Sequence, residues 1–300
     1  METSALNTVV SIPAVAFDEA GHIDVARSQA VIDRMVQAGI SAFTATGNTG
    51  EFYSLSATER RMAHELTAEA ASGAQLIAGV GLDTATAIDE GRRALELGFQ
   101  SVMVHHPPHP FVSPEGWLAY NAEIAAALPD ATIVPYVKSP QIPRATVRQL
   151  VETAPNVGAV KFAVADPTQF GQIVHEVERP VQWICGVAEM WAPAFWGVSG
   201  VAAFTSGLAN VAPRLSLAMF GALQAGDLAK AVACWQLVAP FERLRFDAAS
   251  KNNVSVVKAA MSRLGLCEAT VRPPISELDV DGLEIVDGVL ATLRGEELLD

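Results

Sequence analysis

A chain of 300 residues that is half hydrophobic can bury a large core, either as one barrel domain or as two smaller domains. Its net charge of −13 and its pI near 4.9 argue against nucleic-acid binding, and no apolar stretch of about 18 residues could cross a bilayer. Residues 1–8 lack the cationic start of a signal peptide, and three widely spaced cysteines fit a reducing compartment. We therefore expect a cytoplasmic protein without disulfides.

Short apolar runs alternate with amphipathic segments along most of the chain. The apolar runs suit strands buried on both faces, and they are residues 8–17, 40–46, 75–82, 99–105, 131–137, 157–164, 181–187 and 198–206. The segments with helical spacing between them are 25–37, 57–71, 85–97, 117–127, 145–153 and 168–177. This alternation favours a (β/α)8 TIM barrel over a doubly wound sheet, which would more often show a glycine-rich phosphate loop after its first strand.

The remainder of the chain is predicted to be helical. Apolar residues recur at spacings of three and four in 228–238, 254–264 and 283–293. No linker rich in Gly, Ser or Pro separates this part from the barrel. We expect residues 1–214 to form the barrel core, and 215–300 to supply the last barrel helix and a C-terminal helical extension packed in the same domain.

The apolar run VGAVKFAVAD (157–166) contains a lysine, Lys161. Burial disfavours the charged form of an amine, so the pKa of Lys161 should fall. One interpretation is a lysine that extends from a strand end to a surface carboxylate. The other places its amine in the mouth of the barrel, where the C-terminal strand ends carry chemistry, as a nucleophile that forms a Schiff base with a carbonyl.

Such a nucleophile needs a proton relay and donors for a substrate carboxylate. Tyr136, at the end of the preceding strand, could supply the relay, although a buried core tyrosine is the alternative. The turn TGNTGE (46–51) offers backbone N–H groups with the side chains of Asn48 and Thr49. It could equally be an ordinary turn, with Ser56 and Glu59 forming a capping box for the next helix.

Together, GNTGE, Tyr136 and VGAVKFAVAD resemble the dihydrodipicolinate synthase/N-acetylneuraminate lyase superfamily, and the resemblance extends to ICG (184–186), FTSGLANVAPR (204–214) and VRPPISEL (271–278). It implies a class I lyase for 2-oxo acids that uses no metal and no cofactor and assembles as a homotetramer or homodimer. Lys161 would be the Schiff-base lysine and Tyr136 the relay. Asn48 and Thr49 would bind the carboxylate, and Gly186 would line the site. Glu51 is interpreted as structural.

Departures from the synthase pattern point to a 2-oxo-3-deoxy sugar acid as substrate. The loop HHPPHPFVSPEG (105–116) lacks the synthases' aromatic pair, with His109 nearest the place of the missing tyrosine. Gln141 and Ile142 stand where the synthases carry an arginine for the carboxylate of aspartate semialdehyde, and Arg144 is displaced. Ser206 and His109 are predicted to meet substrate hydroxyls, while Lys138 or Arg144 could still supply a cation.

Three functional hypotheses remain. The first is a Schiff-base dehydratase or aldolase for a 2-oxo acid, with dihydrodipicolinate synthase as the alternative substrate assignment. The second is a metal-dependent aldolase that uses His105, His106 and His109. The third is a catalytically silent barrel that binds a 2-oxo acid.

Overall fold

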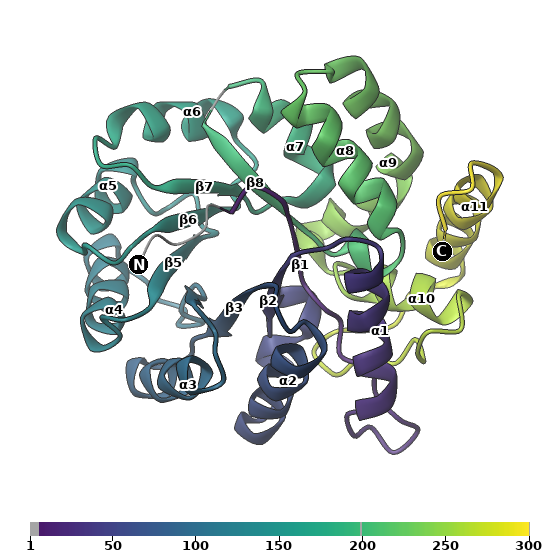
Figure 1. The fold of residues 1–300 in the computed structure, drawn as a ribbon, viewed down its shortest axis with the longest axis horizontal. Coiled ribbons are helices and arrows are strands. Elements are labelled where there is room, and N and C mark those ends of the chain that lie inside the picture. The colour runs from purple at the N-terminus through teal and green to yellow at the C-terminus, as the bar shows by residue number, and fades with distance from the viewer. Residues whose placement is uncertain (1–5, 199, 300) are drawn as a thin grey trace.

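The computed structural model describes residues 6–198 and 200–299 and forms a closed barrel of parallel strands in sequential order, with β8 paired to β1. The strands are β1 (Val9–Ser11), β2 (Ala42–Ala45), β3 (Gln75–Val80), β4 (Ser101–Val104), β5 (Thr132–Val137), β6 (Ala159–Phe162), β7 (Gln182–Cys185) and β8 (Val201–Ser206). Helices follow the strands and surround them (Figure 1). The predicted (β/α)8 barrel is confirmed. Parts of two predictions, on residues 1–8 and on the strand over 198–206, lie outside the described residues.

The barrel helices begin where the sequence provides caps. They are α1 (Val25–Gln37), α2 (Ala57–Ala70), α3 (Thr84–Glu96), α4 (Pro114–Ala127), α5 (Arg144–Thr153), α6 (Pro167–Glu176), α7 (Ala188–Trp196) and α8 (Pro213–Gln224). The side chains of Asp24, Asp83 and Asp166 each accept a hydrogen bond from the backbone at the third helical position, which satisfies a donor that the helix leaves free. The predicted capping box of Ser56 and Glu59 is present at α2.

Two elements differ from the sequence-based expectation. The first strand is only three residues long, because Pro13 has no N–H to donate to a neighbouring strand. Beyond Ser11, the side chain of Asn210 takes the place of strand-to-strand hydrogen bonds. It donates to the carbonyl of Ile12 and accepts from the N–H of Ala14, at 2.9 Å each. Helix α7 contains Pro193 and lies between two predicted strands where no helix was assigned.

Three further helices extend the barrel on one side (Figure 1). They are α9 (Leu228–Ser250), α10 (Ser255–Arg263) and α11 (Val280–Gly295), and each contains one of the predicted helical segments or most of it. The backbone of α9 leaves helical geometry at Asp247, and Ala248, Ala249 and Ser250 all have positive φ. Residues on both sides of this break lie at the C-terminal ends of the strands. Within the described residues, no helix combines the length and apolar character needed to span a membrane.

Candidate active site

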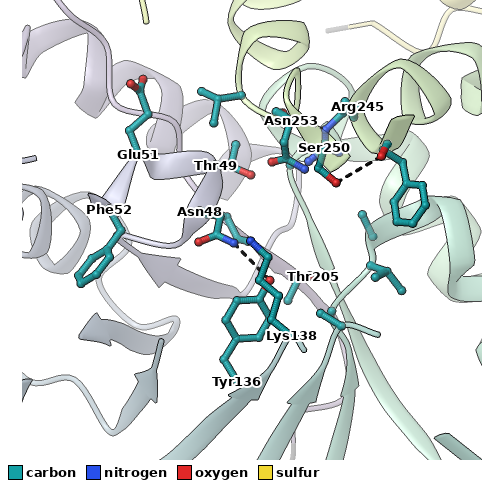
Figure 2. A pocket seen from close by; sticks show the side chains of 18 of the residues that line it. Asn48, Thr49, Glu51, Phe52, Tyr136, Lys138, Thr205, Arg245, Ser250 and Asn253 are labelled. Carbon is teal, nitrogen blue, oxygen red and sulfur yellow. Dashed lines mark hydrogen bonds between the residues drawn. The ribbon is translucent and has the colours of Figure 1, made fainter. Parts of the chain in front are cut away.

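A cavity of about 310 Å³ opens at the C-terminal ends of the strands, where barrel enzymes carry their chemistry (Figure 2). Its volume lies in the range of small-molecule sites. Strand ends and the segment after the α9 break both line it. The polar lining residues are Asn48, Thr49, Glu51, Tyr53, Ser54, Tyr136, Lys138, Lys161, Thr205, Glu242, Arg245, Ser250 and Asn253.

Lys161 lies on β6 inside this cavity, with a side chain that is almost completely buried. Its Nζ is 3.7 Å from Sδ of Met103 and 4.4 Å from the centroid of the Tyr136 ring, and no carboxylate pairs with it among the described residues. Desolvation, aided by repulsion from the Lys138 ammonium, lowers the pKa of Lys161 to about 7. A large fraction of the amine is therefore neutral and nucleophilic near neutral pH.

Tyr136 stands beside Lys161, because the two residues are register partners on β5 and β6. Burial raises the pKa of the Tyr136 phenol, which therefore carries its proton at neutral pH. Nδ2 of Asn48 donates a hydrogen bond to the Tyr136 hydroxyl oxygen at 3.2 Å (Figure 2). That bond leaves the phenol free to donate its own proton and would stabilise the phenolate after transfer.

The turn after β2 brings Asn48 and Thr49 to the cavity wall. Residues Asn48–Gly50 form a short 3-10 turn, and Thr49 is buried next to Gly207 at the end of β8. Oδ1 of Asn48 is buried without a hydrogen-bond partner within the described part of the chain. A buried acceptor of this kind, next to a hydroxyl, is suited to a polar ligand atom.

Gly186 follows β7, and because it has no side chain there is room beside it for the side chain of Lys161. A Cβ atom at this position would lie 2.9 Å from Cγ of Lys161 and 2.8 Å from Cβ of Ala163. Both distances are shorter than normal carbon contacts, so any larger residue would displace the lysine. The structure thus brings Lys161, Tyr136, Asn48, Thr49 and Gly186 together in one cavity.

Ser206 and His109 do not line this cavity. The Ser206 hydroxyl donates to Oε1 of Glu189 at 2.5 Å in a buried network behind the wall, and its neighbour Thr205 faces the cavity instead. His109 is exposed, and its Nδ1 accepts a hydrogen bond from the Phe111 N–H. Strand pleating explains the first difference, because adjacent residues point to opposite faces.

The three histidines of the loop after β4 occupy separate environments. His105 is stacked on Phe52, with ring centroids 4.1 Å apart, and its Nε2 lies 2.9 Å from the Thr46 carbonyl oxygen. Burial lowers the pKa of His105 to about 3, so the ring is neutral. Across the described residues, no group of three His, Cys, Asp or Glu side chains is arranged to hold a metal ion.

Two basic residues besides Lys161 line the cavity: Lys138, which the sequence analysis named as a possible cation, and Arg245, which it did not name. Lys138 follows Tyr136 by two residues, so the period of the strand directs both side chains to the same face. Arg245 comes from α9, far away in the chain, and no local motif identifies it. Arg144, in contrast, pairs with Glu176 at 3.1 Å and does not line the cavity.

Glu51 has a structural environment, as the sequence interpretation proposed. It adopts φ 57°, and its carboxylate points away from Tyr136 (Figure 2). There it pairs with Nζ of Lys258 at 2.5 Å and accepts a hydrogen bond from the Arg272 N–H at 3.1 Å. This buried pair ties the turn that carries Asn48 and Thr49 to α10.

Comparison with known proteins places this site in a family. The model of the dihydrodipicolinate synthetase family matches residues 5–292. A probable 5-dehydro-4-deoxyglucarate dehydratase from Rhodococcus opacus (strain B4) is 29% identical over 284 residues, which cover 93% of each chain. A 4-hydroxy-tetrahydrodipicolinate synthase from Gluconobacter oxydans (strain 621H) is 31% identical over 289 residues, again 93% of each chain.

Solved structures give the same relationship. The crystal structure of dihydrodipicolinate synthase from Bacillus clausii is 36% identical with a TM-score of 0.93, covering 97% of this chain and 98% of that one. The corresponding enzyme from Oceanobacillus iheyensis is 32% identical with a TM-score of 0.92, covering 96% and 97%. The resemblance seen in the sequence motifs is therefore confirmed, and this chain is a lyase that belongs to the dihydrodipicolinate synthetase family.

Proposed function

We propose that this protein is a Schiff-base lyase that dehydrates or cleaves a 2-oxo-3-deoxy sugar acid through an imine on Lys161. The observation that carries the proposal is a desolvated lysine, unpaired with any described carboxylate, next to a protonated tyrosine in a cavity large enough for a six-carbon acid. A lysine used only for stability would be expected to have a carboxylate partner.

In the first step, the neutral amine of Lys161 attacks the substrate carbonyl carbon. Tyr136 donates its proton to the oxygen that departs as water, and the positively charged imine forms. Asn48 and Thr49 hold the carboxylate beside the carbonyl. No cofactor takes part, because the imine itself withdraws electrons from the neighbouring carbon.

The second step depends on the imine. The carbon next to it gives a proton to the Tyr136 phenolate left by the first step, and the imine becomes an enamine. The enamine then expels the hydroxyl group of the following carbon as water, when that group takes the proton back from Tyr136. The net change is loss of one water molecule, and hydrolysis of the new imine releases the product and Lys161. In the cleavage alternative, the hydroxyl group of the following carbon loses its proton. The bond between that carbon and the carbon next to the imine then breaks.

A synthase activity is the second candidate, and Lys138 is the observation that favours it. The Lys138 ammonium could hold the carboxylate of aspartate semialdehyde, although Gln141 and Ile142 occupy the positions after it. Relatives with both names are similar to this chain at about the same identity, 29% and 31%. We favour the sugar acid because two residues of the synthase pattern are missing from this sequence. The loop after β4 lacks the tyrosine, and the loop after β5 lacks the arginine at its usual position.

The test has two stages. The protein is first incubated with pyruvate and borohydride, and mass spectrometry of its peptides is expected to find the reduced adduct on Lys161 and none in Lys161→Met. Turnover of 5-dehydro-4-deoxyglucarate and condensation of pyruvate with aspartate semialdehyde are then compared at equal enzyme concentration. An adduct without any turnover would support a silent 2-oxo acid barrel. Turnover that a chelator abolishes, without an adduct, would support the metal-dependent alternative.

We also infer a homotetramer or homodimer. Phe111 is 86% exposed on the loop after β4, and Tyr53 is 43% exposed beside that loop, with its hydroxyl donating to the His106 carbonyl. Large exposed aromatic side chains are typical of a contact between subunits. Sedimentation equilibrium of the protein and of Phe111→Ser is expected to show a weaker assembly in the variant.

A further inference from the structure

Arg245 is a buried cation at the cavity wall that uses two of its five N–H donors in hydrogen bonds to Glu242 and Asn253. Its side chain is 4% exposed. Nη1 donates to Oε1 of Glu242 at 2.7 Å, and Nε donates to the carbonyl of Asn253 at 3.2 Å. A guanidinium has donors on all three nitrogens, and among the described residues Nη2 has no recorded partner. The two existing bonds fix the plane of the group and leave Nη2 for a ligand.

Gly207 makes the space into which Nη2 extends. A Cβ atom on Gly207 would collide with Nη2 of Arg245 and would lie 3.0 Å from Oγ1 of Thr49. The backbone of Gly207 has ordinary helical angles, so its conformation does not require glycine. The absence of a side chain here instead leaves the guanidinium open towards the cavity and the Thr49 hydroxyl.

Among the described residues, Glu242 is the carboxylate in direct contact with Arg245. Glu189, behind the wall, accepts hydrogen bonds from Ser206 and Ser216, and burial together with the nearby Glu242 raises its pKa. A substrate carboxylate would add the second anion that a fork-shaped guanidinium can hold.

Arg245 lies across the cavity from Tyr136 and Lys138 (Figure 2), with its Nη2 near the Thr49 hydroxyl. Figure 2 shows Arg245, Ser250 and Asn253 on one side, and Tyr136 and Lys138 on the other. Lys161 on β6 and Gly207 after β8 are two strand spacings apart, roughly 10 Å. Pyruvate attached to Lys161 would leave this span partly empty, whereas a six-carbon chain would extend along it.

The geometry points to Arg245 as the residue that binds the far carboxylate of a dicarboxylic 2-oxo sugar acid and so selects it over an acid with a single carboxylate. This inference rests on the proposed function, whose substrate class it narrows. Ser250 and Asn253, which reach the cavity because α9 breaks at Asp247, would complete the site with neutral donors and acceptors.

The test measures binding separately from chemistry. On the Lys161→Met background, calorimetry compares 5-dehydro-4-deoxyglucarate with its analogue in which the far carboxylate is a hydroxymethyl group. We expect the dicarboxylate to bind about 10- to 100-fold more tightly, the range for charge-assisted hydrogen bonds. Arg245→Gln should remove this preference, and Arg245→Lys should keep part of it.

Two controls separate selection from folding. Arg245→Gln leaves Glu242 buried without its partner, so Arg245→Gln/Glu242→Gln is prepared as well and checked by urea denaturation. Lys138→Met, which removes the other cavity cation, should leave the preference intact. Equal affinities for the two acids in the starting protein, an equal loss for both acids in the arginine variants, or a preference that depends on Lys138 would each overturn the inference.

A separate experiment distinguishes failure of the Arg245 site from failure of the Schiff-base mechanism. Borohydride trapping with pyruvate, which has no far carboxylate, should modify Lys161 equally in the protein with and without Arg245→Gln. Failure of trapping in both, together with an Arg245-dependent preference in calorimetry, would end the Schiff-base mechanism and leave the carboxylate site standing.

Discussion

Two lysines in this barrel are equally hidden from solvent but differ in what surrounds the amine. Lys258, on α10, has a fully buried side chain with Glu51 at 2.5 Å and the Thr270 carbonyl oxygen at 2.8 Å. Lys161, on β6, has a methionine sulfur and an aromatic ring as its nearest recorded neighbours. Burial lowers the pKa of both amines, but at Lys258 the Glu51 carboxylate opposes that effect.

The difference separates a paired, structural cation from an amine whose proton is easily lost. A buried charge is tolerated when an opposite charge and hydrogen bonds replace water, as they do around Lys258. Where they do not, the group gives up its proton instead. The lack of a described carboxylate partner at Lys161 is therefore more informative than its burial. Exchanging each lysine for methionine, which keeps the length and removes the charge, provides a matched pair.

The largest expected effect is on catalysis by Lys161→Met. The variant should show no detectable turnover and no borohydride-trapped adduct, because no other amine occupies the position of the nucleophile. Its stability in urea at pH 7 should equal or exceed that of the unmodified protein. The unfolded chain binds a proton at Lys161 up to a pKa of about 10.5 and the folded chain only up to about 7, so in that window this amine lowers stability. Unchanged turnover would refute the role of Lys161.

Tyr136→Phe should reduce turnover about 10²- to 10⁴-fold, the usual contribution of a positioned acid or base. The ring and its packing against Lys161 are retained, so the effect isolates the hydroxyl. Rates of imine formation, followed by rapid-quench borohydride trapping, are expected to fall in parallel. Turnover within about threefold of the unmodified protein would assign the proton relay to another group.

Lys258→Met should produce the reverse pattern. Loss of one partner leaves Glu51 buried and unpaired, so the free energy of unfolding is expected to fall by about 3–5 kcal/mol. Urea denaturation measures this change. Lys258→Met/Glu51→Gln should recover much of the loss, because the buried charge is gone. If Lys258→Met is as stable as the starting protein, the pair does not stabilise the turn.

The smallest expected effect is a shift in pH dependence. The rate of imine formation with pyruvate should rise as pH increases through about 7 and then level off, because only the neutral amine of Lys161 reacts. Lys138→Met removes a repelling positive charge, so the pKa of Lys161 and the midpoint of the profile should move upward. Trapping rates between pH 5 and 9 in both proteins test this, and a downward shift would contradict it.

Most of the barrel and half of the site follow from local signals in the sequence. Apolar runs separated by capped amphipathic segments were sufficient for the fold, and a lysine inside such a run identified Lys161. The early end of β1 was missed because it depends on Asn210, whose side chain reaches across from the end of β8. Helix α7 was missed because Pro193 interrupts its pattern.

The other half of the site depends on tertiary packing. Ser206 was predicted to meet substrate hydroxyls, but the pleat of β8 directs it towards Glu189 and leaves Thr205 facing inward. Arg245 was not identified at all, since its place in the cavity depends on how α9 packs against the strand ends. A regular helical pattern carries no information about which distant strand end a helix covers.

The pairing of Glu51 with Lys258 also has a consequence for synthesis of the chain. The turn that carries Asn48 and Thr49 is translated early, whereas its buried counter-charge is more than two hundred residues later. Chains grow at about 5–20 residues per second, so for at least roughly ten seconds this turn exists without the lysine that neutralises it. A nascent chain that has already paired its first strands therefore cannot bury Glu51 at low cost. Assembly of the turn that carries Asn48 and Thr49 is thereby delayed until α10 leaves the ribosome.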